Sequence, residues 1–232
     1  MRSVWEGQKE LCGSSCRSDT LEPLKSYTAA VPVEEKAQAV LDFWLGPLDE
    51  HGQANADHGK RWFSKDEAFD HEVGERFGEL YAEIAAGRHE DWLDDPRGRL
   101  AYVIVLDQFS RNMFRGSPRT FDRDPQALAA AVDGIARGHD RGLGLDERAF
   151  LYMPFMHSEA LSMQDRSVAL FSALAADAPP EQRERLAAAL RFAVAHREIV
   201  ARFGRFPHRN KVLQRTTTRP EMEFLQQPGS SF

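Results

Sequence analysis

Hydrophobic residues recur every three or four positions along most of this chain, which is the spacing of amphipathic helices. The first such helix begins after Pro32 and is expected to end at Gly46, and a second is expected from Asp66 to about Ala86. No segment shows the alternation of apolar and polar residues that marks a half-buried strand. Further helices are expected over residues 97–115, 125–137, 147–163, 165–176 and 180–203, with a short last helix after Thr218.

Individual residues refine this pattern. The run LAYVIVL at 100–106 has little amphipathicity, so the helix that contains it is expected to be central and buried on most sides. Pro154 should kink the helix over 147–163, and Thr218 with Glu221 three residues later is typical of a capping box. The polar stretch 47–65 is predicted to be a loop that Trp62 and Phe63 anchor to the core.

The predicted fold is all-α, with short loops that favour stacked antiparallel helical hairpins in a tetratricopeptide-like array. A fixed repeat of about 34 residues is not found, so this likeness is geometric only. Residues 1–31 have no periodicity and are predicted to be a flexible leader. A single helical domain is expected over 32–227, and a frayed tail over 228–232.

Composition narrows the function classes. The net charge of −6 and the pI near 5.8 argue against nucleic-acid binding, which usually requires a basic domain. No apolar run is long enough to span a bilayer, and the first 30 residues lack the apolar stretch of a signal peptide. The two cysteines, Cys12 and Cys16, both lie in the leader, which fits a cytoplasmic protein. The oligomeric state is left open.

Motifs for metal or nucleophilic catalysis are not found. The eight histidines are scattered, without an H-E-x-x-H pattern, and there is no G-x-S-x-G elbow. The two cysteines alone cannot supply a tetrahedral zinc set. We therefore expect neither a metal nor a cofactor.

Three segments instead place polar side chains among apolar ones, and the first is DQFSRNMFRG at 107–116. Its spacing puts four polar residues on one face of a helix, and Asp107 precedes Arg111 in the order that favours an ion pair. A polar stripe on a buried helix can open into a cleft or form an ion-pair network between helices, and the sequence does not decide between these. The four residues on that face are Gln108, Arg111, Asn112 and Arg115.

The second segment is FLYMPFMHSEAL at 150–161, in which His157 and Glu159 lie among large apolar residues. A lone histidine on an apolar helix is more often a hydrogen-bonded core residue than a ligand or a base. Glu159 needs a cationic partner there, and Arg111 or an arginine of 202–209 is the expected one.

The third segment, HREIVARFGRFPHRN at 196–210, reverses the sign of the overall charge. From His196 to Arg215 it has six Lys or Arg and one carboxylate, Glu198. Arginines around a turn made by Gly204 and Pro207 suit a carboxylate or phosphate. The alternative is that they neutralise internal acids and the helix C-terminus. The candidate ligand-binding residues here are His196, Arg202, Arg205, Arg209 and Asn210, with His208 as a further candidate acid or base.

From about residue 38 to residue 225 the chain resembles the bacterial domain of unknown function 924 family. The resemblance implies a tetratricopeptide-like all-helical fold and no established activity or cofactor. The chain departs from the family pattern in its leader and near 213–218. The segments that carry the resemblance are VLDFWLG, RWF with Asp66, Phe69 and Asp70 after it, LDQFSRNMFRGSPRTFDRDP, FLYMPFMHSE and HREIVARFGRFPHRN.

The sequence therefore predicts an arginine- and histidine-lined cleft that binds a small anionic molecule, a carboxylate or a phosphate. His157, His208 and Glu159 are the candidate catalytic residues if the cleft also supports a reaction. The alternative is an interaction module that binds an acidic peptide on a surface of stacked helices.

Overall fold

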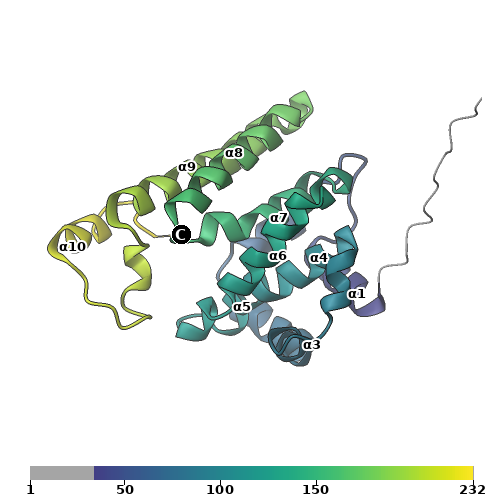
Figure 1. Ribbon diagram of the computed structural model, residues 1–232, viewed down its shortest axis with the longest axis horizontal. Helices are drawn as coiled ribbons and strands as arrows, with labels where there is room; N and C mark the ends of the chain where they lie inside the picture. Colours follow the sequence, from purple (N-terminus) through teal and green to yellow (C-terminus); the bar gives the residue numbers. More distant parts are fainter. Residues whose placement is uncertain (1–33, 232) are drawn as a thin grey trace, which may run out of the picture. The chain divides into compact units, whose positions relative to one another are not determined.

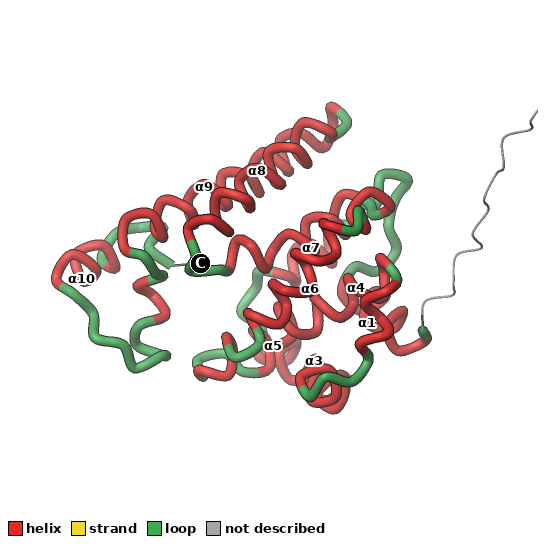
Figure 2. The backbone as a smooth tube through the Cα atoms, viewed as in Figure 1, coloured by secondary structure: helices red, strands yellow, loops and turns green. Residues whose placement is uncertain are grey.

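The computed structural model describes residues 34–231, and these residues form an all-α protein (Figures 1 and 2). No strand occurs in this range, where Leu48 and Ala54 form an isolated β-bridge. The leader expected over residues 1–31 lies outside the described residues. The proposed limits of the domain and its tail stay predictions.

The helices follow the predicted order. The α-helices are α1 Glu35–Trp44, α2 Ala56–Trp62, α3 Glu67–Ala85, α4 Pro96–Val103, α5 Ser110–Met113, α6 Asp124–Ala136, α7 Leu145–His157, α8 Leu161–Asp177, α9 Arg183–Phe203 and α10 Arg219–Leu225. Between α4 and α5 lies a π-helical segment, η2 Ile104–Phe109. Short 3-10 turns are η1 Glu90–Asp94, η3 Pro118–Phe121, η4 His139–Gly142, η5 Pro180–Gln182 and η6 Pro207–Arg209.

The central position of the helix around 100–106 is confirmed. Every residue from Gly98 to Phe109 is buried. Helices α1, α3, α6 and α7 pack around this segment, while α7 packs on α8 and α8 on α9. Figure 1 shows α8 and α9 side by side along their lengths. Phe109 contributes to an aromatic cluster, with ring centroids 4.8 Å from Phe77 and 5.6 Å from Trp44.

Local signals explain most helix ends. Asp66 caps α3 by accepting hydrogen bonds from the Ala68 and Phe69 amides, and Gly204 ends α9 in the left-handed conformation with φ of 68°. The capping box of Thr218 and Glu221 is confirmed at α10.

Two predictions about the stretch 47–65 are wrong. Asn55 caps a helix there, α2, which has no buried residue and therefore leaves no hydrophobic period in the sequence. Trp62 does anchor this stretch, because its indole N–H donates to the Trp44 carbonyl at 2.8 Å. Phe63 does not, since it is 72% exposed.

The boundary between α7 and α8 also differs from the prediction. Helix α7 begins after Gly144 and ends at His157 instead of running to 163, so α8 begins earlier than expected. Asp146 does not cap α7. Its buried carboxylate accepts a hydrogen bond from the Ala54 amide and lies 2.5 Å from the Arg185 guanidinium, which ties α7 to distant segments.

No helix within residues 34–231 is long and apolar enough to cross a bilayer. The cytoplasmic location expected from the sequence stays a prediction.

Candidate functional site

The π-helical segment η2 places Asp107 and Gln108 inside the protein. Asp107 is fully buried, and its carboxylate accepts hydrogen bonds from Gln108 Nε2 at 2.6 Å and from His157 Nδ1 at 2.8 Å. Arg111, four residues on, lies 3.4 Å from the same carboxylate, so the predicted ion pair is confirmed. π-Helical turns are rare and are often found at functional sites.

The charges around Asp107 set the protonation of the pair that it forms with His157. Burial alone would raise the pKa of Asp107, but Arg111 and His157 outweigh burial and hold the pKa well below its usual range. Burial, with Arg111 as the second cause, lowers the pKa of His157. An ionised carboxylate can only accept, so the proton of neutral His157 lies on Nδ1 and the lone pair on Nε2.

Arg111 and Arg209 meet at one carboxylate. Asp124, the first residue of α6, lies 3.0 Å from Arg111 Nη1 and 3.5 Å from Arg209 Nη1. Arg209 also donates to the His157 carbonyl at 3.0 Å, and its guanidinium lies 4.5 Å from the Phe121 ring centroid and 4.6 Å from that of Phe206. The structure thus brings together two arginines distant in sequence, around an internal acid.

Glu159 lies beside this group but has a different partner from those expected from the sequence. Its carboxylate accepts hydrogen bonds from both terminal nitrogens of Arg215, at 2.7 and 3.0 Å, and from the Phe206 amide at 2.8 Å. The expectation that Arg111 or an arginine of 202–209 would pair with Glu159 is therefore wrong. Arg215 reaches it because the turn after α9 folds back.

The remaining residues of the third segment do not converge on one point. Arg205 forms a two-pronged pair with Glu221 of α10, at 2.7 and 2.9 Å. Arg202 is exposed, with its guanidinium 4.7 Å from the Phe203 ring centroid. Buried Asn210 accepts from Arg215 Nε at 3.0 Å.

Two further histidines lie near His157. The His196 ring is 6.5 Å from the His157 ring, and its Nδ1 lies 2.8 Å from the Phe192 carbonyl. Burial lowers the pKa of His196 to about 3 and that of His208 to about 4, with nearby cationic groups acting in the same direction. Both rings are therefore neutral at physiological pH.

The predicted polar face of 108–115 divides between two neighbours. Arg111 turns toward α6, whereas Asn112 and Arg115 turn toward α3. There Asp70 accepts from Asn112 Nδ2 at 2.7 Å and from Arg115 Nε and Nη2 at 2.7 and 2.8 Å. Three of the four polar residues on that face therefore link the central helix to two others. Gln108 does not, because its side chain donates to Asp107 on the same helix.

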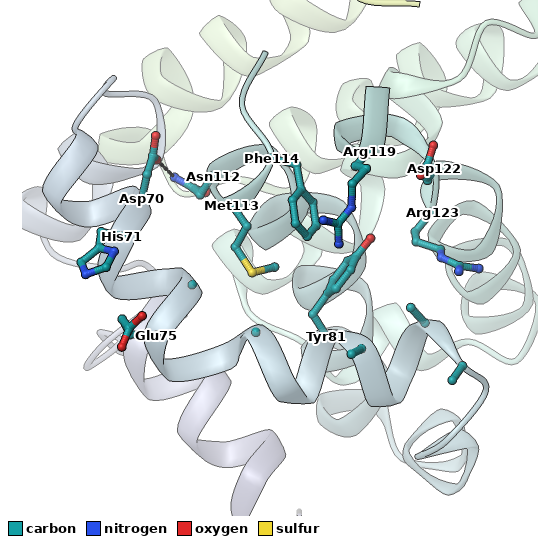
Figure 3. A pocket seen from close by; sticks show the side chains of 15 residues that line it. Asp70, His71, Glu75, Tyr81, Asn112, Met113, Phe114, Arg119, Asp122 and Arg123 are labelled. Atoms are coloured by element: carbon teal, nitrogen blue, oxygen red, sulfur yellow. Dashed lines mark hydrogen bonds between the residues drawn. The ribbon is translucent and has the colours of Figure 1, made fainter. Parts of the chain in front are cut away.

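A cavity of about 670 Å³ lies on the α3 side of this linkage. Figure 3 shows its side chains: Asp70, His71 and Asn112 lie at one end and Tyr81, Phe114 and Arg119 at the other. The volume is within the range of small-molecule sites, roughly 300–1,000 Å³. The lining residues from α3 and its C-cap are Asp70, His71, Gly74, Glu75, Gly78, Tyr81, Ala82, Ala85 and Ala86.

The end of the cavity near Tyr81 is cationic. The Arg119 guanidinium lies 3.9 Å from the Phe114 ring centroid, a stacked position that leaves its N–H edge available. Within residues 34–231, neither Arg119 nor Arg123 has a carboxylate within 4.0 Å, although Asp122 also lines the cavity. Burial raises the pKa of Tyr81, against the opposing effect of Arg123 and Arg119, so its hydroxyl remains a donor.

Arg119, Arg123 and Tyr81 are not among the site residues predicted from the sequence. A signal was present, because Gly74 and Gly78 interrupt a strongly periodic helix without ending it, and such glycines usually have a packing or functional reason. In the part of the chain that the structure describes, no group of three or more His, Cys, Asp or Glu side chains is placed to hold a metal ion.

Fold and site together define an all-helical protein with a buried acid–histidine pair between its central helix and α7, and a separate cavity on α3. The chain belongs to the DUF924 family of bacterial proteins of unknown function, whose model matches residues 40–229. The resemblance noted from the sequence is thereby confirmed.

A solved structure supports the same assignment. It is that of a protein of unknown function, ATU0120, from Agrobacterium tumefaciens, which is 37% identical to this chain with a TM-score of 0.70. The match covers 82% of this chain and 97% of that one. No curated protein matches the chain.

Proposed function

We propose that this protein binds a small organic anion in the cavity between α3 and the segment 112–123, with Arg119 and Arg123 as its anchors. The observation that carries the proposal is the pair of guanidinium groups at one end of a cavity of about 670 Å³, neither paired with a carboxylate among residues 34–231. Arginine binds carboxylate and phosphate in a two-pronged geometry, and stacking on Phe114 orients Arg119 for it.

This proposal keeps the ligand class expected from the sequence and moves its location. Arg111, Arg115, Arg205 and Arg209 each have an internal carboxylate partner, so an anion there would have to displace Asp107, Asp124, Asp70 or Glu221. Those pairs favour a structural role for these arginines. Their ligand-binding role stays a prediction, as does the acid–base role of His157.

The acidic-peptide alternative has less support. Arg205, its natural anchor, donates to both carboxylate oxygens of Glu221 within the same chain. We also infer that α7, α8 and α9 form successive antiparallel hairpins of the tetratricopeptide kind. Support comes from the short connection at 158–160 and from the packing of α7 on α8 and α8 on α9.

Isothermal titration with benzoate and its uncharged analogue benzamide tests the anion site. At constant ionic strength benzoate is expected to bind about tenfold more tightly, since charge-assisted hydrogen bonds contribute roughly 1.5–3 kcal/mol. The double variant Arg119→Gln with Arg123→Gln should remove most of this difference.

Arg166→Gln is the matched control. Arg166 also lies over a phenylalanine ring, 5.2 Å from the Phe155 centroid, and also has no carboxylate within 4.0 Å among the described residues. It does not line the cavity. Equal affinities for benzoate and benzamide would show that the site is not an anion site. So would an equal loss of benzoate affinity in the double variant and in the control.

A further inference from the structure

Two glycines in the wall of the cavity narrow the class of molecule that it can hold. Gly74 and Gly78 lie in the interior of the 19-residue helix α3, where glycine lowers helix stability relative to alanine. They are four residues apart, as are Gly78 and Ala82, so these three positions form a wall with almost no side chains.

The packing of the protein itself does not require these glycines. A Cβ atom at Gly78 would have no neighbour within 4 Å, and one at Gly74 would have Met113 Cγ at 3.9 Å. Neither glycine has the positive φ that favours glycine elsewhere in this chain. Gly98 contrasts with them, because a Cβ there would lie 2.8 Å from the Trp92 carbonyl oxygen. The space above the α3 backbone is therefore open.

The opposite side of the cavity is apolar and aromatic. Met113 and Phe114 face α3, and the Phe114 ring centroid lies 5.1 Å from that of Tyr81 (Figure 3). Methionine adapts its shape to what it packs on, and aromatic rings favour flat apolar surfaces. The two arginines of the lining are at one end of the cavity. The carboxylates of Asp70 and Glu75 lie at the other end, where Arg115 neutralises Asp70.

We infer that the cavity holds an organic acid with a flat apolar body. The body lies across the α3 backbone at Gly74 and Gly78, beneath Met113 and Phe114, and the carboxylate reaches Arg119 and Arg123. The inference rests on the proposed function, which needs only the anion. It adds that the apolar body supplies most of the affinity.

A pair of probes tests the body separately from the charge. 2-Naphthoate, measured by isothermal titration, is expected to bind about a hundredfold more tightly than acetate, measured by NMR titration, because its two rings leave water. Gly78→Leu places a side chain over the wall and should weaken 2-naphthoate about tenfold or more. It should change acetate affinity by less than about twofold, since Arg119 and Arg123 are untouched.

Gly59→Leu is the control for a leucine in place of a partly buried helical glycine, because a Cβ at Gly59 in α2 also has no neighbour within 4 Å. It should leave both affinities unchanged. Gly78→Ala guards against misfolding of the leucine variant. It should fold at least as stably as the wild type and weaken 2-naphthoate about threefold.

The outcomes separate this inference from the proposed function. Equal binding of acetate and 2-naphthoate, both lost when Arg119 and Arg123 become glutamine, would overturn the flat body and keep the anion site. An affinity for 2-naphthoate that Gly78→Leu does not change would also overturn the inference. Failure of both probes to bind, or binding indifferent to the arginine variants, would overturn the proposed function.

Discussion

Asp107 and His157 are 50 positions apart in the chain, yet the carboxylate of one accepts the Nδ1 proton of the other at 2.8 Å. This bond joins the central helix to the last turn of α7. Arg111 completes the group by balancing the charge of Asp107, which is fully buried. Because a buried carboxylate is stable only with such partners, several measurable properties depend on this arrangement.

His157 should be neutral at pH 7, with its proton on Nδ1. Burial and Arg111 lower its pKa below the ordinary 6.5, and the ionised Asp107 fixes the tautomer. Long-range ¹H–¹⁵N NMR spectra distinguish Nδ1–H from Nε2–H directly. His71, which is exposed on α3, is the internal comparison. A His157 ring protonated on Nε2 at pH 7 would show that Asp107 does not hold it as described.

Asp107→Asn should destabilise the fold by about 3 kcal/mol, because it removes one member of a buried ionic group and leaves Arg111 with Asp124 alone. Urea denaturation gives the free energy of unfolding. Asp165→Asn is the control, since Asp165 pairs with Arg197 at 2.9 Å on the surface. Loss of this surface pair should lower the free energy of unfolding by less than about 1 kcal/mol. Similar losses in the two variants would contradict the buried ion pair.

The helical class and most helix positions follow from periodicity and capping residues, as at Asp66 and Thr218. Helix α2 could not be predicted this way, because none of its residues is buried and the pattern depends on burial. The π-helical segment was not predicted either. All of its residues are buried, whether apolar or polar. When every side of a helix is buried, a π turn does not change the spacing of hydrophobic residues in the sequence.

The site was harder to predict because sequence shows where charges are but not which of them neutralise each other. Arg111 and Arg209 do approach one another, as expected, but Asp124 lies between them. Arg119 and Arg123 lie between the helices that the sequence predicts over 97–115 and 125–137. Their importance depends on the cavity beside them, and that cavity forms only when α3 packs against α5.

The free energy of unfolding should fall as the pH drops from about 6.5 toward 4. Burial lowers the pKa of His196 from 6.5 to about 3 and that of His208 to about 4. The unfolded chain therefore binds more protons than the folded one in this window. Each group lowers stability by up to about 1.4 kcal/mol per pH unit below 6.5 and has no such effect above it.

His196→Gln should flatten this pH dependence, because glutamine does not titrate. Thermal or urea unfolding at pH 7.5, 6 and 5 measures the slope for the wild type and the variant. His51→Gln is the control, since His51 is partly exposed. A slope that does not change in His196→Gln would mean that His196 is not a source of the acid sensitivity.

Gly78→Ala should stabilise the protein, although it narrows the proposed ligand site. Alanine removes conformational freedom from the unfolded chain and favours the helix, together worth roughly 0.5–1 kcal/mol, and the space at Gly78 is open. Gly98→Ala should do the opposite, because its Cβ would lie 2.8 Å from the Trp92 carbonyl oxygen and force the backbone apart. Urea denaturation of both variants shows whether each substitution raises or lowers the free energy of unfolding. If Gly78→Ala is also destabilising, the α3 glycines have a packing role, and the argument that they leave room for a ligand loses its basis.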